Sequence, residues 1–201
     1  MMRKETPDWL KALGPGRKEA RPFTAFQRKR ERLGQPPRVW HVEVRYRQWD
    51  GPRLPWSEDF GKGSGQVYSL VGERPQRSCN EVEVAKLLRA VRPEAYWISG
   101  FAPSQIPDLW RPWVLGPTEA PTWLREFDWR LRPRIYAPKT GMPDVVAWDP
   151  GQGLKSVLFV ECKGPKERIM DAQEDWVAAA IEEGVPASSF AVAIRVFQVG
   201  H

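Results

Sequence analysis

GMPDVVAW, residues 141–148, and SVLFVECKGP, residues 156–165, are the two segments that decide the fold of this chain. Each contains a short apolar run, which is typical of a buried β-strand. The segment between them, DPGQGLK at 149–155, is rich in turn-forming residues. The pattern therefore predicts a β-hairpin with one strand at 145–148 and the other at 156–163.

Charged residues stand at the ends of both predicted strands. Residues two apart in a strand lie on one face, so Glu161 and Lys163 share a face and Cys162 points into the opposite layer. Asp144 opens the partner strand, where its carboxylate can lie beside that of Glu161. The hairpin thus predicts two carboxylates and an ammonium group in one small site at the end of a sheet.

Two neighbouring carboxylates repel each other, and a hard cation would stabilise the pair. Mg²⁺ prefers oxygen ligands and is often held by one or two carboxylates, so Asp144, Glu161 and the carbonyl of Cys162 are candidate metal ligands, with Mn²⁺ as a substitute ion. Lys163 could orient or deprotonate a water that attacks a phosphate group, or stabilise the negative charge on that phosphate in the transition state. An Asp…Glu-x-Lys pattern alone occurs by chance in many chains. Here it directly follows an apolar strand, where charges are costly without a partner or a role.

Further motifs follow in order. The chain has Glu167-Arg168 after the second strand, and then Gln173 and Trp176. From 141 to 185 it resembles the VRR-Nuc branch of the PD-(D/E)XK nucleases. The resemblance implies an α/β, restriction-endonuclease-like mixed central β-sheet flanked by helices. It also implies a Mg²⁺-dependent endonuclease that hydrolyses DNA, with branched or flapped structures as candidate substrates. Junction-cutting members of this fold often act as two-fold dimers, so a homodimer is a further hypothesis.

The segment from Ile169 to Glu183 is predicted to be a helix that ends at Gly184. Its residues at helical spacing form one apolar face, and Gln173 is a polar residue on that face. Gln173 could be a satisfied core amide. The resemblance implies instead a catalytic-site role, with a hydrogen bond near Lys163.

Nucleases of this class usually carry one more acidic residue on an early helix. A helix is predicted from Asn80 to about Val91, and Glu81 and Glu83 are the candidates. Glu81 shares a face with the apolar residues that would pack on the sheet, so it is the predicted third catalytic carboxylate and metal ligand. Alternatively, it only complements the helix dipole.

The net charge of +6 favours a polyanionic partner such as DNA. Arg168, Lys166 and Lys139 are the candidate nucleic-acid contacts. Arg168 could equally form a surface salt bridge with Glu167 or Asp171.

Outside the motifs, residues 1–38 are predicted to be a basic N-terminal extension, partly helical or flexible, with short helices near 8–13 and 23–33. Residues 39–201 would form the nuclease-like domain, with the core motifs at 78–199. This domain would begin with a half-buried antiparallel strand at 40–49, and a short strand is predicted around 67–71.

A Trp- and Pro-rich insertion occupies about 96–140 of the predicted domain, with a short helix near 121–131. The insertion's tryptophans could stack on bases or pin the segment to the core, and the second role is favoured. They are Trp97, Trp110, Trp113, Trp123 and Trp129.

The composition also argues against several classes of protein. The N-terminus lacks the apolar run of a signal peptide, and no stretch approaches the ~20 apolar residues of a membrane span. Two cysteines are too few for a disulfide framework. A cytoplasmic protein is therefore expected. The alternatives to a nuclease are a non-cleaving nucleic-acid binder that retains the fold, and an interaction protein that docks a partner through its tryptophans.

Overall fold

The computed structural model describes residues 7–22, 37–46, 80–100, 110–116, 118–135 and 141–197. The predicted helix at 23–33, the predicted strand at 67–71 and the candidate DNA contact Lys139 lie outside these residues. In the described part of the chain, no helix is both long and apolar enough to cross a membrane.

The described strands form one seven-stranded mixed sheet in the order β1-β2-β7-β6-β5-β3-β4. β5 and β6 pair antiparallel, which confirms the predicted hairpin, and β6 pairs parallel with β7. β2 runs antiparallel to β1 and parallel to β7. The strand at 40–49, which was predicted to be antiparallel, therefore pairs antiparallel on one side and parallel on the other. The strands are β1 (Lys18–Pro22), β2 (Arg38–Tyr46), β3 (Glu94–Ile98), β4 (Val114–Leu115), β5 (Val145–Trp148), β6 (Leu158–Lys163) and β7 (Phe190–Phe197).

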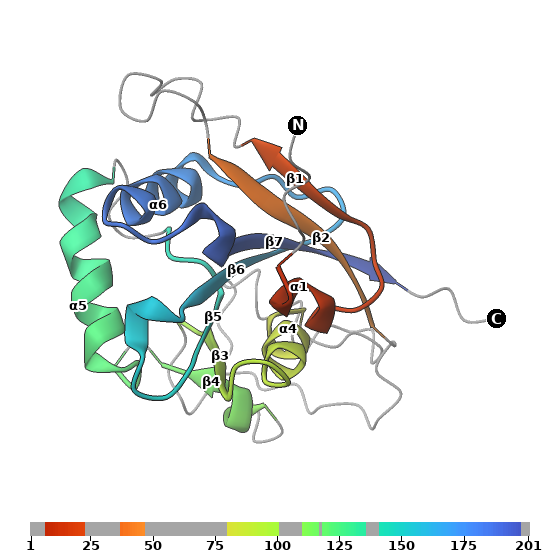
Figure 1. Cartoon of the computed structure of the whole chain (residues 1–201), viewed down its shortest axis with the longest axis horizontal. Helices are drawn as coiled ribbons and strands as arrows, with labels where there is room; N and C mark the ends of the chain where they lie inside the picture. The colour runs from red at the N-terminus through yellow and green to blue at the C-terminus, as the bar shows by residue number, and fades with distance from the viewer. Residues whose placement is uncertain are drawn as a thin grey trace, which may run out of the picture.

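Helices cover both faces of this sheet (Figure 1). α1 (Trp9–Ala12) and α4 (Asn80–Leu88) lie on one face. α5 (Thr122–Leu131) and α6 (Asp171–Glu182) lie on the other. This arrangement confirms the predicted α/β class with a mixed central sheet flanked by helices. Short 3₁₀ helices occupy Arg111–Trp113 (η3), Arg132–Arg134 (η4), Gly153–Lys155 (η5) and Ala187–Ser189 (η6).

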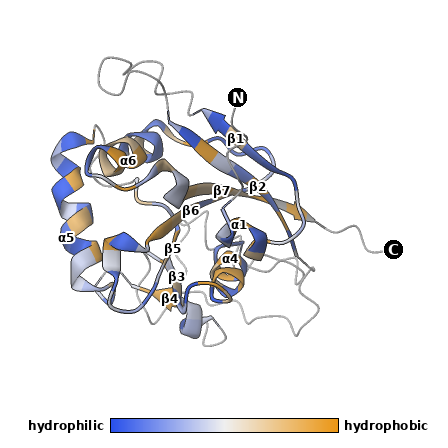
Figure 2. Ribbon diagram, in the orientation of Figure 1, coloured by the Kyte–Doolittle hydropathy of each residue, from blue (hydrophilic) through white to orange (hydrophobic). Residues whose placement is uncertain are grey.

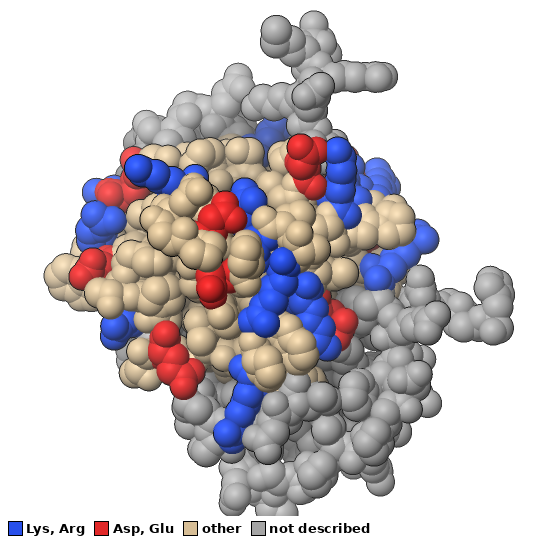
Figure 3. Space-filling model, turned by 60° about the horizontal axis from the view of Figure 1, so that its bottom comes forward, with Lys and Arg blue, Asp and Glu red and all other residues tan. Residues whose placement is uncertain are grey.

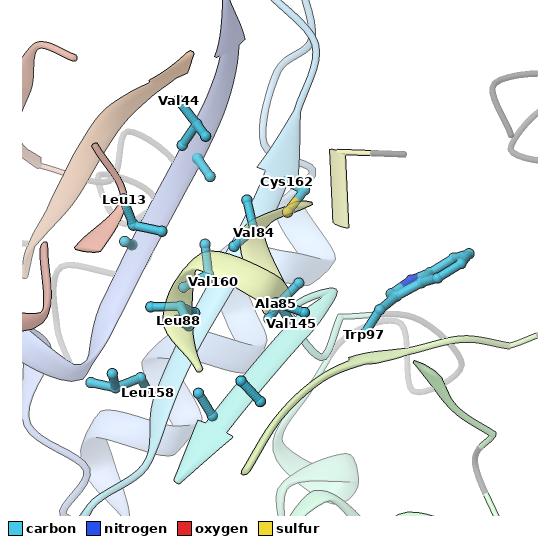
Figure 4. Packing of buried hydrophobic residues seen from close by; sticks show 14 of the residues in the cluster. Leu13, Val44, Val84, Ala85, Leu88, Trp97, Val145, Leu158, Val160 and Cys162 are labelled. Atoms are coloured by element: carbon cyan, nitrogen blue, oxygen red, sulfur yellow. The ribbon is translucent and has the colours of Figure 1, made fainter. Parts of the chain in front are cut away.

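The strand β6 supplies apolar side chains to both layers. Leu158, Val160 and Cys162 pack toward α4 (Figure 4), whereas Phe159 packs toward α5 and α6. Successive residues of a strand point to opposite faces, so Glu161 and Lys163 lie on the α6 side. Figure 2 shows hydrophobic central strands, and it shows α5 with mixed hydrophilic and hydrophobic residues along its length.

Three strands of the described chain, β1, β3 and β4, were not predicted. β1 lies inside the segment predicted as an extension, and it pairs with β2 at the edge of the sheet. Trp9 and Leu10 of α1 are buried in the core on the α4 side. β3 lies at the start of the predicted Trp/Pro-rich insertion and pairs with β5. The N-terminal residues 7–22 and the first part of that insertion thus contribute to the same sheet as the motifs.

Candidate active site

Asp144 is held in place through both its backbone and its side chain. It directly precedes β5, and its carbonyl accepts a hydrogen bond of 2.8 Å from the backbone N–H of Ile98 in β3. Its carboxylate oxygen Oδ2 accepts one of 2.8 Å from the backbone N–H of Cys162 in β6. The strands on either side of β5 therefore fix Asp144 next to Glu161.

The loop that carries Asp144 begins at Gly141, where a residue with a side chain would not fit. The φ of Gly141 is +151°, and a Cβ atom at this position would lie 2.7 Å from the carbonyl oxygen of Ala172 and 3.1 Å from Cβ of Trp176. A contact below 3 Å with a backbone atom forces the structure to shift. The lack of a side chain thus lets the loop that carries Asp144 lie directly against α6.

Glu161 is the centre of a buried polar cluster and is only 5% exposed. Its Oε1 lies 2.8 Å from Nζ of Lys163 and also accepts a hydrogen bond from Nε2 of Gln173. The amide oxygen of Gln173 accepts a bond of 2.9 Å from the N–H of Met170, the residue before α6. Gln173 therefore fixes Glu161 to the start of α6.

The second oxygen of Glu161, Oε2, is buried and has no hydrogen-bond partner. Burial raises the pKa of Glu161 well above its ordinary value, the neighbouring charge of Asp144 raises it further, and Lys163 opposes the shift. Burial also raises the pKa of Asp144, although the Cys162 N–H lowers it. The two carboxylates therefore repel each other, and one amine compensates them only in part.

These residues fit a hard divalent cation. An unsatisfied, buried carboxylate oxygen next to a second carboxylate offers only oxygen ligands, which Mg²⁺ prefers, and Mg²⁺ keeps several of its waters in such sites. In the described part of the chain, no cluster of three or more His, Cys, Asp or Glu could hold a metal ion. Two carboxylates are therefore the acidic ligands that the described structure brings together.

Glu81, the predicted third carboxylate, lies in the first turn of α4. α4 packs on the face of the sheet opposite to α6, and Glu81 does not join Asp144 and Glu161 in a cluster. Its neighbour Glu83 forms an ion pair of 2.9 Å with Lys86. A metal-binding role for Glu81, like that of the Cys162 carbonyl, stays a prediction.

The predicted DNA contacts in the described chain lie on an exposed turn after β6. Lys166 and Arg168 are both exposed there. Between them, Glu167 accepts a hydrogen bond of 2.7 Å from the N–H of Gly164, so it stabilises the turn. On the face shown in Figure 3, Lys and Arg side chains form a band beside a small group of acidic residues.

A cleft of about 610 Å³ opens next to this cluster. Asp144 and Gln173 line it, together with residues of α5, the end of β3 and the start of α6. Arg125, Trp129 and Arg132 of the α5 region also line it. The sequence named Trp129 only as one of five tryptophans that could stack on bases or pin the segment to the core, and it did not single out either arginine. The i, i+4 and i+7 spacing places the three residues on one stripe of a helix.

The sequence from Asp128 to Ala193 matches the family model described as the VRR-NUC domain. Residues 128–193 are therefore similar to a VRR-NUC domain. The family is a member of the PD-(D/E)XK-like nuclease superfamily, and it confirms the restriction-endonuclease-like fold.

The VRR-NUC match covers about a third of the chain, including Asp144, Glu161, Lys163 and Gln173. Glu81 lies outside it. No curated protein matches the chain. The VRR-NUC domain indicates a nuclease, and therefore a nucleic-acid substrate.

The repulsion between the carboxylates predicts a gain of stability when one is neutralised. A carboxyl group whose folded pKa is raised stabilises the fold fully below its unfolded pKa, and this contribution is lost as the pH rises through the folded value. We expect Asp144→Asn to raise the unfolding free energy of the metal-free protein at pH 8. The gain should be on the order of 1 kcal/mol, or roughly 2–4 °C in melting temperature.

Thermal melting in EDTA at several pH values checks this expectation. The difference between Asp144→Asn and the wild type should shrink as the pH falls toward the ordinary carboxyl value of 3.8. A variant that melts below the wild type at pH 8 would show that the pair does not destabilise the metal-free fold.

Proposed function

We propose that this protein is a metal-dependent nuclease that hydrolyses phosphodiester bonds of DNA. The observation that carries the proposal is the cluster at the end of β6. There a buried Glu161 with one unsatisfied oxygen lies beside Asp144, and Lys163 contacts its other oxygen. Two carboxylates that can hold a divalent ion, with an ammonium group beside them, suit the hydrolysis of a phosphodiester. The cluster lies in the segment that is similar to a VRR-NUC domain and opens to a cleft at Asp144.

Asp144 and Glu161 would hold Mg²⁺ or Mn²⁺, with the Cys162 carbonyl as a further oxygen ligand. When bound, such an ion lowers the pKa of water and neutralises charge on the scissile phosphate. The Cys162 N–H keeps the Asp144 carboxylate pointed at the site. Gln173 keeps the Glu161 carboxylate there by holding it to α6.

Lys163 is the cationic side chain of this cluster. Its Nζ lies 2.8 Å from Glu161 Oε1, and its side chain is only about 11% exposed. A partly desolvated ammonium group at this position can orient an attacking water or stabilise negative charge that develops on the phosphate. We therefore assign Lys163 the role of stabilising the transition state, with Asp144 and Glu161 as ligands.

A cleavage assay tests the proposal. The purified protein is incubated with single-stranded, duplex, flapped and four-way DNA in Mg²⁺, Mn²⁺ or EDTA. The matched control is Asp144→Asn, which loses one carboxylate and should retain the fold, because its amide oxygen can still accept the N–H of Cys162. We expect cleavage of at least one substrate with either ion, and none in EDTA or with the variant.

Cleavage that persists in EDTA would contradict metal dependence. Cleavage by Asp144→Asn at the wild-type rate would show that a contaminant or another site is responsible. If the wild type binds these DNAs but cuts none of them with either ion, the protein is a non-cleaving binder that retains the nuclease fold.

A further inference from the structure

Two large apolar side chains of the described chain are markedly exposed. Trp129 on α5 is 73% exposed, and Met170 at the start of α6 is 52% exposed. Both line the cleft that contains Asp144. Exposed apolar side chains are common when scattered singly, but their convergence on one concave surface indicates a binding site.

The helix α5 separates a core face from a cleft face. Leu124, Phe127 and Leu131 are buried against the sheet and α6. Arg125 and Trp129, followed by Arg132, line the cleft, whose wall also includes Leu124. Since Trp129 lies outside the core, it does not pin α5 to the fold. The predicted role of the insertion's tryptophans as core anchors therefore fails at this one residue.

The charges of this stripe are arranged for an anionic ligand. The carboxylate of Asp128 accepts hydrogen bonds from Arg132 through Oδ2 and from the indole N–H of Trp176 through Oδ1. The negative charge of Asp128 is thus neutralised by Arg132 within the protein. The guanidinium of Arg125 is exposed and donates a bond of 3.2 Å to the hydroxyl of Thr122, a neutral partner. Because this partner is neutral, the positive charge of Arg125 can pair with an anionic group of a ligand in the cleft.

We propose that this cleft binds an unpaired nucleotide of the substrate, with its base stacked on Trp129 and its phosphate contacted by Arg125. Bases stack on aromatic side chains in proteins that bind single strands, and basic residues follow the backbone. A base inside a duplex has both faces covered by its neighbours, and a terminal base stays paired to its complement, so it does not enter a cleft that holds one nucleotide. The indole therefore stacks on an unpaired base. The inference rests on the proposed nuclease function and adds to it a binding site for one unpaired nucleotide, formed by Trp129 and Arg125.

The test is equilibrium binding of labelled oligonucleotides to the full chain in EDTA, so that binding is measured separately from cleavage. The probes are single-stranded oligo-dT, the same length of oligo-rU, a blunt duplex and a flapped duplex. Trp129→Ala should weaken binding of the single strand and the flap by about 5- to 100-fold. Its effect on the blunt duplex should stay within about twofold, and Trp129→Phe should restore most of the affinity.

Arginine substitutions on the same helix provide a matched pair. Arg125 lines the cleft, whereas Arg130 lies over the ring of Phe127, 5.8 Å from its centroid, and is not among the lining residues. Arg125→Ala should weaken single-strand binding several-fold and lower the slope of log affinity against log salt by about 0.7. Arg130→Ala should leave both quantities unchanged.

Three outcomes would overturn the inference. They are wild-type affinity of Trp129→Ala for the single strand, an equal loss on the blunt duplex, and no binding of any oligonucleotide by the wild type, which would point to a protein partner. Binding that depends on Trp129, without cleavage in Mg²⁺ or Mn²⁺, would support this inference and refute the proposed nuclease function. The two hypotheses therefore fail separately.

Discussion

Replacing Lys163 by methionine should slow DNA cleavage by about 100- to 1,000-fold, the usual cost of removing one transition-state donor. Methionine has a similar length and keeps the apolar stem, so the change removes mainly the ammonium group. Metal binding should persist, because both carboxylates remain. Glu161→Gln, in contrast, should lose both cleavage and metal binding, because it removes a ligand.

Two measurements separate these roles. Single-turnover cleavage in Mg²⁺ reports the chemical step, and the rise in melting temperature on addition of Mg²⁺ reports binding of the ion by the folded state. Lys163→Met should keep the rise, and Glu161→Gln should lack it. Cleavage by Lys163→Met within tenfold of the wild type would remove Lys163 from the mechanism. A wild-type rise for Glu161→Gln would exclude Glu161 as a ligand.

Trp176→Ala should lower the free energy of unfolding by about 3–5 kcal/mol. This is a larger loss than we expect for Trp176→Phe or Trp129→Ala. Trp176 is only 1% exposed. Its ring makes edge contacts with Phe159 at 4.9 Å and with Phe127 at 5.9 Å between centroids, and its N–H donates to Asp128 at 2.8 Å. The substitution would leave a large cavity among α5, α6 and β6. The melting temperature should fall by roughly 6–20 °C.

Two other variants serve as controls for this loss. Trp176→Phe keeps a ring in the core but removes the N–H, so it should cost about 1–3 kcal/mol. Trp129→Ala removes an exposed indole and should change stability by no more than about 0.5 kcal/mol. Chemical denaturation of the three variants measures these differences. Equal losses for Trp176→Ala and Trp129→Ala would contradict the described packing.

The sequence predicted the centre of the site because its determinants are local. The hairpin follows from two apolar runs and a turn, and the period of two along β6 places Glu161 and Lys163 on one face and Cys162 on the other. The helical period likewise placed Gln173 and Trp176 on the buried face of α6. Short-range geometry decides all of these positions.

The parts that were missed depend on long-range pairing. β3 fixes Asp144 from a segment whose prolines and tryptophans hide any strand period. Helical spacing placed Glu81 beside the apolar residues of α4, but it could not show which face of the sheet α4 covers, so the role of Glu81 stays a prediction. The exposure of Trp129 likewise depends on how α5 packs, because its residue type alone favours burial.

Asp128 adds a polar connection between α5 and α6, which also contact each other through Phe127 and Trp176. One of its oxygens holds the helix that carries Gln173, and the other orients Arg132 at the cleft. A screen of acidic residues that measured only turnover would therefore count Asp128 among the metal ligands. Its effect would instead come from the relative placement of two helices, and only separate measurements of ion affinity and strand affinity would reveal the difference.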